Sequence, residues 1–192
     1  AAIQKSLFDE YLQSFKLIDI EPNVITSACF SNWNLVRQTD LDKGAASVIL
    51  VDIESQNTDL TIYKDNRFVF TRNISIGSGD FTDILKSQPQ LPLEKPEDIE
   101  LLWGLGKQSG SLEGTKADTF MEIRKRLQNE AEILRKEIEL TIQHYYQITH
   151  GNRIDKCLLL GVGSQMKGLV DFLKQRLEIP AEELDIPDNK LE

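Results

Sequence analysis

The sequence predicts an α/β fold in which a mixed sheet is crossed by one long helix. Two short apolar runs, 48–51 and 154–160, have the length and composition of buried strands. Two alternating segments, 60–63 and 68–71, have the pattern of a β-hairpin joined by a short polar turn. Apolar residues recur at helical spacing over 117–150, so the helix there is long enough to cross the whole sheet.

Composition and charge limit the classes of function. The 192 residues are 40% hydrophobic, which suits one domain or slightly more with a real core. The net charge of -9 and the lack of a basic run exclude broad nucleic-acid binding. No apolar stretch approaches the roughly 20 residues that a membrane span needs, so we expect no direct membrane insertion. The chain begins with Ala-Ala-Ile and without a signal-peptide pattern, so we expect a fragment of a longer protein.

The cysteines and histidines predict no chemistry of their own. Cys29 and Cys157 are far apart and lie among apolar neighbours, which predicts two buried, reduced thiols in a cytosolic protein. His144 and His150 are six residues apart on the predicted helix and do not share a face. We therefore expect no metal site built from these residue types.

The N-terminal quarter predicts two helices. Residues 5–15 place four large apolar side chains on one helical face. Glu21 and Pro22 predict the start of a second helix, because proline suits the first helical turn. Asn32 falls within the mostly apolar stripe of that second helix. The polar loop 38–44 is the expected domain boundary.

The rest of the chain alternates helices and loops. Ser78 is the expected N-cap of a helix that follows the hairpin. Three prolines in 87–96 and four glycines in 104–114 predict two loops around another short helix. The glycine-rich turn 161–164 joins the second buried strand to a helix, and we expect 177–192 to be extended.

Two turn-rich corners, 52–58 and 161–164, follow the two buried strands. In a parallel or mixed α/β sheet both corners lie at the carboxyl ends of strands, where they could face one ligand. Asp52 could then act through metal-bound water, while Thr58 and backbone N–H groups could bind phosphate. Alternatively, Asp52 caps its turn and the glycines only allow tight packing. Spacing alone leaves both interpretations open.

Longer segments resemble a known superfamily. The sequence DIESQNTDLTI at 52–62, together with Gly-Ser-Gly at 77–79, resembles the second phosphate-binding segment of the actin-like ATPases. LLGVGSQMKGL at 159–169 resembles the adenosine segment of that superfamily. Within it the chain most resembles the PilM family of type IV pilus assembly proteins, to which FtsA and the cytoplasmic domain of GspL are related. Three further stretches resemble the same family: 8–21, 67–74 and 137–146.

This resemblance implies an actin-like, ribonuclease H-like lobe and a division of the chain. Residues 1–44 would form the end of an inserted subdomain and a connecting helix. Residues 45–192 would form the second lobe, with a variable helical insertion at about 87–116. The first phosphate loop of the family would precede residue 1.

The resemblance also implies a nucleotide site for ATP with Mg²⁺, or a cleft that has lost its cofactor. Asp52 would be catalytic, and would hold Mg²⁺ through water, only in an active protein. The resemblance assigns these positions to cofactor binding: Asp52, Glu54, Ser55, Gln56, Asn57, Thr58, Gly77, Gly79, Glu100, Gly161, Gly163 and Ser164.

Three residues depart from the family pattern. Glu54 stands where the family has glycine, and Val162 also replaces a glycine. Trp103 stands where the family has a lysine near the ribose. Two like charges about 4 Å apart cost on the order of 1 kcal/mol in water and more in a drier cleft. We therefore expect Glu54 to repel a triphosphate unless Mg²⁺ or an outward rotamer relieves the repulsion.

The resemblance implies a cytoplasmic protein that reaches the inner membrane through partners, namely a PilN-like tail and other pilus assembly proteins. The leading hypothesis is a non-catalytic scaffold of a type IV pilus or related secretion machine, with a weakened nucleotide cleft. The alternative is a functional, slowly hydrolysing ATPase of the same assembly. The third is a small-molecule kinase of the same superfold, for which the sequence shows no substrate-binding motif.

Overall fold

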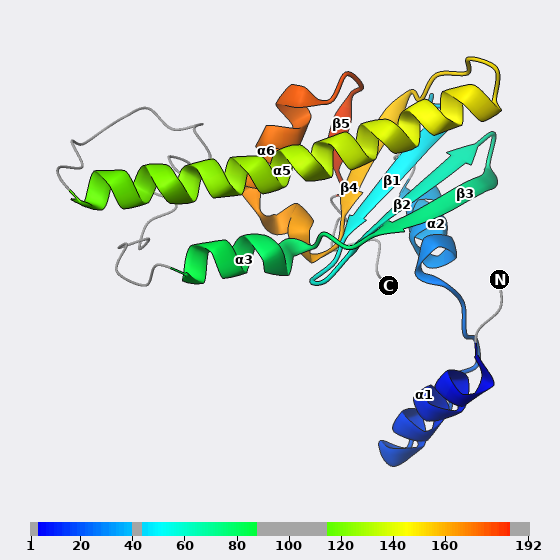
Figure 1. The fold of residues 1–192 in the computed structure, drawn as a ribbon. Coiled ribbons are helices and arrows are strands. Elements are labelled where there is room, and N and C mark those ends of the chain that lie inside the picture. Colours follow the sequence, from blue (N-terminus) through cyan, green and yellow to red (C-terminus); the bar gives the residue numbers. More distant parts are fainter. Residues whose placement is uncertain (1–3, 40–43, 88–114, 185–192) are drawn as a thin grey trace.

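A five-stranded mixed sheet forms the centre of the molecule, in the order β3-β2-β1-β4-β5. The computed structural model describes residues 4–39, 44–87 and 115–184 (Figure 1). β1 is antiparallel to β2 and parallel to β4, while β2–β3 is antiparallel and β4–β5 parallel. The strands are β1 (Ser47–Ile53), β2 (Thr58–Lys64), β3 (Arg67–Ile74), β4 (Lys156–Leu160) and β5 (Ala181–Glu183).

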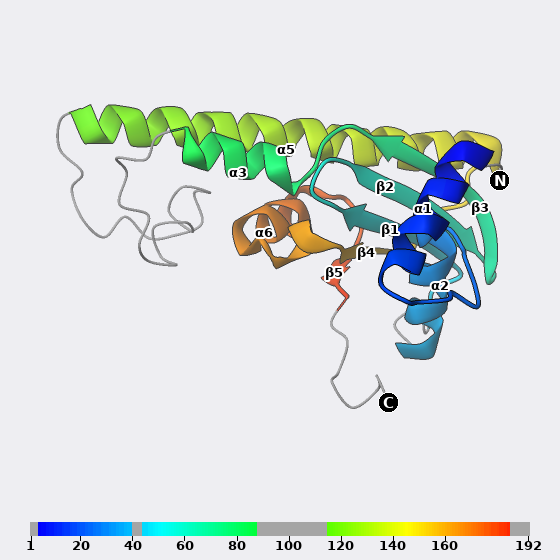
Figure 2. The same ribbon diagram turned by 90° about the horizontal axis from the view of Figure 1, so that it is seen from below.

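Helices cover both faces of this sheet. α3, α5 and α6 lie on one face, and α2 lies on the other (Figures 1 and 2). All seven residues of β1 are buried, as expected for a strand that is covered on both faces. The described helices are α1 (Lys5–Leu17), α2 (Ala28–Thr39), α3 (Ser78–Lys86), α5 (Thr115–Ile148), the 3₁₀ helix η1 (Val162–Gln165) and α6 (Lys167–Arg176).

The larger core lies between the sheet and α5, the 34-residue helix that crosses it. One stripe of α5, including Leu127, Leu134 and Ile138, is fully buried against the β1 and β2 side chains. The predicted α/β class, the mixed sheet with its hairpin and the long crossing helix are confirmed. None of the described helices combines the length and the hydropathy that a membrane crossing requires.

The smaller core lies under α2 on the opposite face. The rings of Trp33 and Tyr63 are stacked with centroids 4.1 Å apart, and Val36 is fully buried beside them. The Tyr63 hydroxyl donates to the Cys29 carbonyl at 2.6 Å. These contacts hold α2 against β1 and β2.

The β2–β3 hairpin turns at Asp65 and Asn66, whose φ angles of 49° and 61° match a two-residue hairpin turn. The pairing register shifts between Ile62 and Tyr63, which places an irregularity in the hairpin. Arg72 of β3 forms an ion pair with Glu137 of α5, so the edge strand is also tied to the long helix.

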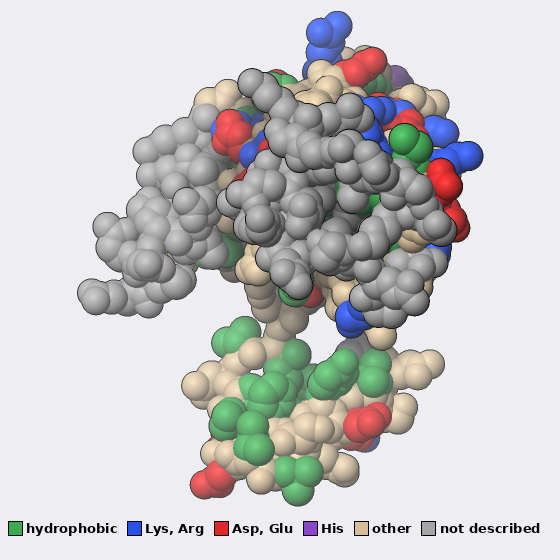
Figure 3. Space-filling model, turned by 90° about the vertical axis from the view of Figure 1, so that its left-hand side faces the viewer, with side chains coloured by type: hydrophobic (Ala, Val, Ile, Leu, Met, Phe, Trp, Pro, Cys, Tyr) green, Lys and Arg blue, Asp and Glu red, His purple; other side chains and the backbone are tan. Residues whose placement is uncertain are grey.

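The N-terminal arm stands apart from the sheet. None of the residues of α1 is buried, and Tyr11 and Phe15 are exposed on its surface. Figure 3 shows apolar side chains gathered on this arm. The amphipathic pattern of 5–15 therefore predicted the helix correctly, although in the described residues its apolar face packs on no core.

Some boundaries in the prediction were wrong. The second helix begins at Ala28 and not at Glu21-Pro22, because residues 24–26 are three consecutive β-branched residues that disfavour helix. Ser78 is the first residue of α3, and Gly77 is its N-cap, with its N–H bonded to the Asp80 carboxylate at 2.8 Å.

The thiol prediction was correct for only one of the two cysteines. Cys157 is buried in β4, and burial raises the pKa of its thiol to about 12. Cys29 is partly exposed because it lies in the first turn of α2, at the margin of the smaller core. The loops and helix expected between 88 and 114 lie outside the described residues, and so does Glu100.

The burial difference along α5 predicts a sharp contrast between two variants. Leu127→Ala removes a fully buried side chain and should lower the free energy of unfolding by about 2–5 kcal/mol. Ile133→Ala, on the exposed side of the same helix, should change it by only about 0.5 kcal/mol. Urea denaturation of the full-length protein measures both. Equal losses would contradict the placement of α5.

Candidate functional site at the carboxyl end of β1

The two predicted corners lie side by side. β1 and β4 are parallel, and Asp52 is in register with Leu160, so the turn after β1 meets the turn after β4 (Figure 1). A Cβ atom added to Gly161 would lie 2.5 Å from Asp52 Oδ1 and 2.6 Å from the Ile53 carbonyl oxygen. The expectation that both corners share one edge of the sheet is therefore confirmed.

Asp52 is the buried carboxyl group among the described residues of this edge. It is 6% exposed, and its Oδ2 accepts a hydrogen bond from Asn32 Nδ2 at 2.6 Å. Burial raises the pKa of Asp52 to about 6, with the Glu54 and Asp59 carboxylates adding to the rise and the Asn32 hydrogen bond opposing it.

The turn after β1 uses its carbonyl groups to hold the start of α3. The Glu54 carbonyl accepts from the Ser78 N–H at 2.8 Å, and the Ser55 carbonyl accepts from the Gly79 N–H at 2.8 Å. Glu54 N–H in turn donates to the Asn57 carbonyl at 2.9 Å. The first N–H groups of α3 are therefore bonded within the chain.

Other N–H groups of the same turn are free. Among the described residues, the backbone N–H groups of Ser55, Gln56 and Asn57 donate to no protein acceptor. Consecutive free N–H groups in a turn are the arrangement that binds an anion. The Thr58 hydroxyl is not free to bind an anion, because Thr58 is fully buried and its hydroxyl donates to the Ile76 carbonyl at 2.8 Å.

The glycines of both corners make room for the chain itself. A Cβ on Gly77 or Gly79 would collide with the Ser55 carbonyl, and a Cβ on Gly163 would collide with the Ile53 side chain. Gly161 has φ +82°, a conformation that side chains other than glycine rarely adopt. Contact of these glycines with a nucleotide stays a prediction, whereas their packing role is explicit in the geometry.

The second corner is closed by hydrogen bonds of its own. The Gly161 carbonyl accepts from the Ser164 hydroxyl at 2.8 Å and from the Ser164 N–H at 3.1 Å. Val162 is 55% exposed, so its side chain stands at the mouth of the corner. η1 then precedes α6, so α6 does not begin directly at the glycine turn.

Asn32 is the site residue that the sequence did not reveal. Its place in an apolar helical stripe gave the only sign, since a lone amide on such a face needs a polar partner. Asp59, opposite Asp52 in the β1–β2 pairing, accepts from Asn73 at 2.7 Å. Among the described residues, no group of three or more His, Cys, Asp or Glu side chains is placed to hold a metal ion.

Residues 4–189 match the model of one protein family, described as type IV pilus assembly protein PilM. The chain belongs to the PilM family. This match covers nearly the whole sequence and confirms the resemblance drawn from the residues at 52–62 and 159–169. No curated protein matches the chain in a direct sequence comparison.

Solved structures agree on the fold. A PilM–PilN type IV pilus biogenesis complex matches with a TM-score of 0.63 and 18% identity, over 93% of this chain and 47% of that one. MreB 5 of Spiroplasma citri bound to AMPPNP matches with a TM-score of 0.55 and 15% identity, over 95% and 61%. An archaeal actin homologue matches with a TM-score of 0.50 and 16% identity, over 82% and 49%.

These likenesses show the actin-like fold. The chain spans about half the length of the PilM chain that it matches, 47% of it. Activities and partners of a whole PilM protein are therefore proposals for this chain.

The raised pKa of Asp52 predicts a pH-dependent effect on stability. Because the folded pKa of about 6 exceeds the ordinary 3.8, ionisation of Asp52 opposes folding as pH rises through both values. Asp52→Asn should therefore stabilise the full-length protein by about 1–3 kcal/mol at neutral pH. Below about pH 4 the gain should disappear, because Asp52 is then protonated in both states.

Urea denaturation at the two pH values measures this difference. Asp83→Asn, an exposed change on α3, is the matched control and should have little effect at either pH. An equal gain from Asp52→Asn at both pH values would contradict the assigned protonation.

Proposed function

We propose that this protein is a scaffold of type IV pilus assembly whose nucleotide cleft is weakened. Membership of the PilM family supports the assembly role. The observation that carries the second half of the proposal is the pair of carboxyl groups, Asp52 and Glu54, at the carboxyl end of β1. These groups lie beside the free N–H groups that would otherwise receive phosphate.

The backbone N–H groups of this corner would attract a phosphate, whereas a carboxylate side chain of the same corner would repel it. The N–H groups of Ser55, Gln56 and Asn57 are the favourable part. Glu54 is exposed at the same turn, and its carboxylate adds negative charge where the phosphates of a nucleotide would approach. ATP with Mg²⁺ would bring a cation that offsets this charge. The side chains of this corner therefore fit a nucleotide only in part.

The proposed partner is the cytoplasmic tail of a PilN-like inner-membrane protein, with other pilus assembly proteins as further contacts. The solved PilM–PilN complex supports this choice. We propose that the protein is cytoplasmic and reaches the inner membrane through that partner. Residues 1–44, with the exposed arm α1, are proposed as the end of the partner-binding subdomain, and 45–192 as the second lobe.

One observation favours the alternative, a slowly hydrolysing ATPase. Asp52 is buried, fixed by Asn32, and has a pKa of about 6. A carboxylate with a pKa near the working pH is suited to accept a proton from an attacking water. In this alternative Asp52 is the base and Asn32 orients it.

Calorimetry with Mg-ATP on the full-length protein separates the two. A weakened cleft should give a dissociation constant above about 10 μM. Glu54→Gly and Glu54→Gln should both strengthen binding about fivefold to a hundredfold, since both remove the charge. Glu122→Gln, on the exposed surface of α5, is the control and should have no effect.

Two results would count against the weakened cleft. Wild-type binding tighter than about 10 μM would favour the ATPase. A gain with Glu54→Gly but not with Glu54→Gln would assign the defect to the bulk of the side chain and not to its charge.

A scaffold should bind its partner without needing to bind or hydrolyse ATP. The full-length protein should bind a PilN-like tail peptide equally with and without Mg-ATP, within about twofold. Fluorescence anisotropy of the labelled peptide measures this. A peptide that binds only in the presence of Mg-ATP would show that the nucleotide site controls assembly.

A further inference from the structure

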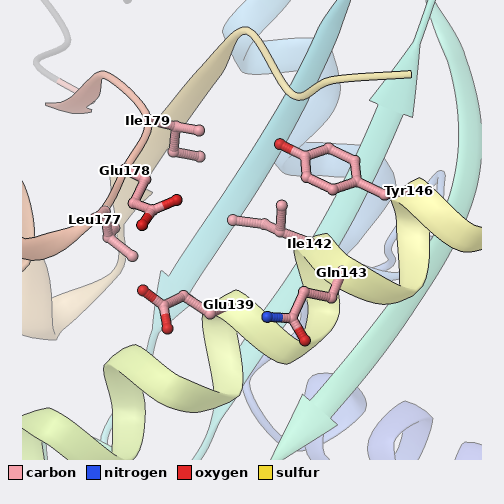
Figure 4. A pocket seen from close by; sticks show the side chains of 7 residues that line it. All are labelled: Glu139, Ile142, Gln143, Tyr146, Leu177, Glu178 and Ile179. Carbon is pink, nitrogen blue, oxygen red and sulfur yellow. The ribbon is translucent and has the colours of Figure 1, made fainter. Parts of the chain in front are cut away.

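A second concave site lies at the other end of the sheet. The carboxyl-terminal part of α5 and the segment 177–179, which joins α6 to β5, enclose a pocket of about 130 Å³ (Figure 4). β5 starts beside Cys157, near the amino end of β4, whereas Asp52 pairs with Leu160 at its carboxyl end. The pocket is therefore separate from the candidate nucleotide site.

The lining of this pocket combines apolar walls with a charged rim. Ile142, Leu177 and Ile179 form the walls, and the ring of Tyr146 stands across from Glu178 (Figure 4). Glu139 and Gln143 complete the rim from α5. Pockets for drug-sized ligands have volumes of about 300–1,000 Å³, so this one suits a single long side chain.

One carboxylate at this pocket has no basic side chain paired with it among the described residues. Arg135 forms ion pairs with both Glu132 and Glu139, so its guanidinium is already engaged. Arg176 lies over the Phe172 ring, 4.4 Å from its centroid. The side chain of Glu178 is exposed and has no ion-pair partner in the part of the chain that the structure describes, whereas the nearby Glu182 and Glu183 are bonded by lysines.

We propose that this pocket receives the side chain of an arginine from a partner protein. The aliphatic stem of arginine can pack against Ile142 and Leu177, and its guanidinium can bond Glu178 through two N–H groups. The Tyr146 ring offers a face on which a guanidinium stacks, which an ammonium uses less well. The net charge of -9 favours the approach of a basic partner segment.

The pocket itself contains reporters for a direct test. The δ1-methyl groups of Ile142 and Ile179 can be labelled in the full-length protein and followed by NMR during titration with N-acetyl-arginine methylamide. Both signals should shift and approach saturation at about millimolar concentration, whereas the signal of Ile62, buried in the larger core, should not move. Glu178→Gln should weaken this binding at least about fivefold. Glu122→Gln should not change it.

Analogues of the arginine probe with a neutral or an ammonium side chain test whether the pocket is specific for a guanidinium. The citrulline analogue, which keeps the shape and loses the charge, should give no saturable shift. Shifts of equal size from citrulline would overturn the proposal, and so would equal affinity for the lysine analogue. Binding that survives Glu178→Gln unchanged, or no shift up to about 50 mM, would also overturn it.

A cellular assay tests whether a partner uses the site. Glu178→Arg should lower piliation at least about fivefold, while Glu122→Arg should leave it unchanged. The affinity of Glu178→Arg for Mg-ATP should stay that of wild type, because the pocket lies away from Asp52. Normal piliation in Glu178→Arg cells would contradict the proposal that a partner protein binds at this pocket. This test does not depend on whether the nucleotide cleft is weakened.

Discussion

The parallel pairing of β1 with β4 is the constraint on which the rest of the structure depends. It joins two segments more than a hundred residues apart and brings their following turns into contact. Gly161 and Gly163 are necessary there, because a side chain on either would collide with the end of β1. The same pairing places β1 in the middle of the sheet, where both of its faces need a cover.

The helices on the two faces of β1 differ in the size of the core that they form and in their polar contacts. α5 contributes a long buried stripe and gives the lobe most of its core. α2 contributes a small core around the stacked Trp33 and Tyr63, together with two hydrogen bonds to the sheet, one from Asn32 to Asp52 and one from Tyr63 to the Cys29 carbonyl. A lost hydrogen bond to a buried carboxyl costs more than a lost exposed one, so this contact is sensitive to any shift of α2. The helix nearest the N-terminal arm is thus linked to the candidate site.

Long periodic elements were predictable from the sequence, because burial of one helical stripe or of a whole strand leaves a local pattern. β1, the hairpin, β4 and α5 follow this rule. The start of α2 was missed because Pro22 outweighed the β-branched run at 24–26. The Asn32–Asp52 contact was missed because it spans twenty residues and depends on how α2 lies on the sheet. Glu100, which the family resemblance assigned to the same site, lies outside the described residues.

The edge strand β3 has a consequence for how this lobe can assemble. An open edge exposes backbone groups that could pair with another chain. Here the register shift between Ile62 and Tyr63 interrupts the regular pairing of the hairpin, and the edge strand carries the charged residues Arg67 and Arg72. Arg72 is also held by Glu137, which keeps the strand against α5. Pairing of β3 with the β3 edge of a second copy is therefore unfavourable. Two copies would have to associate through side-chain surfaces instead.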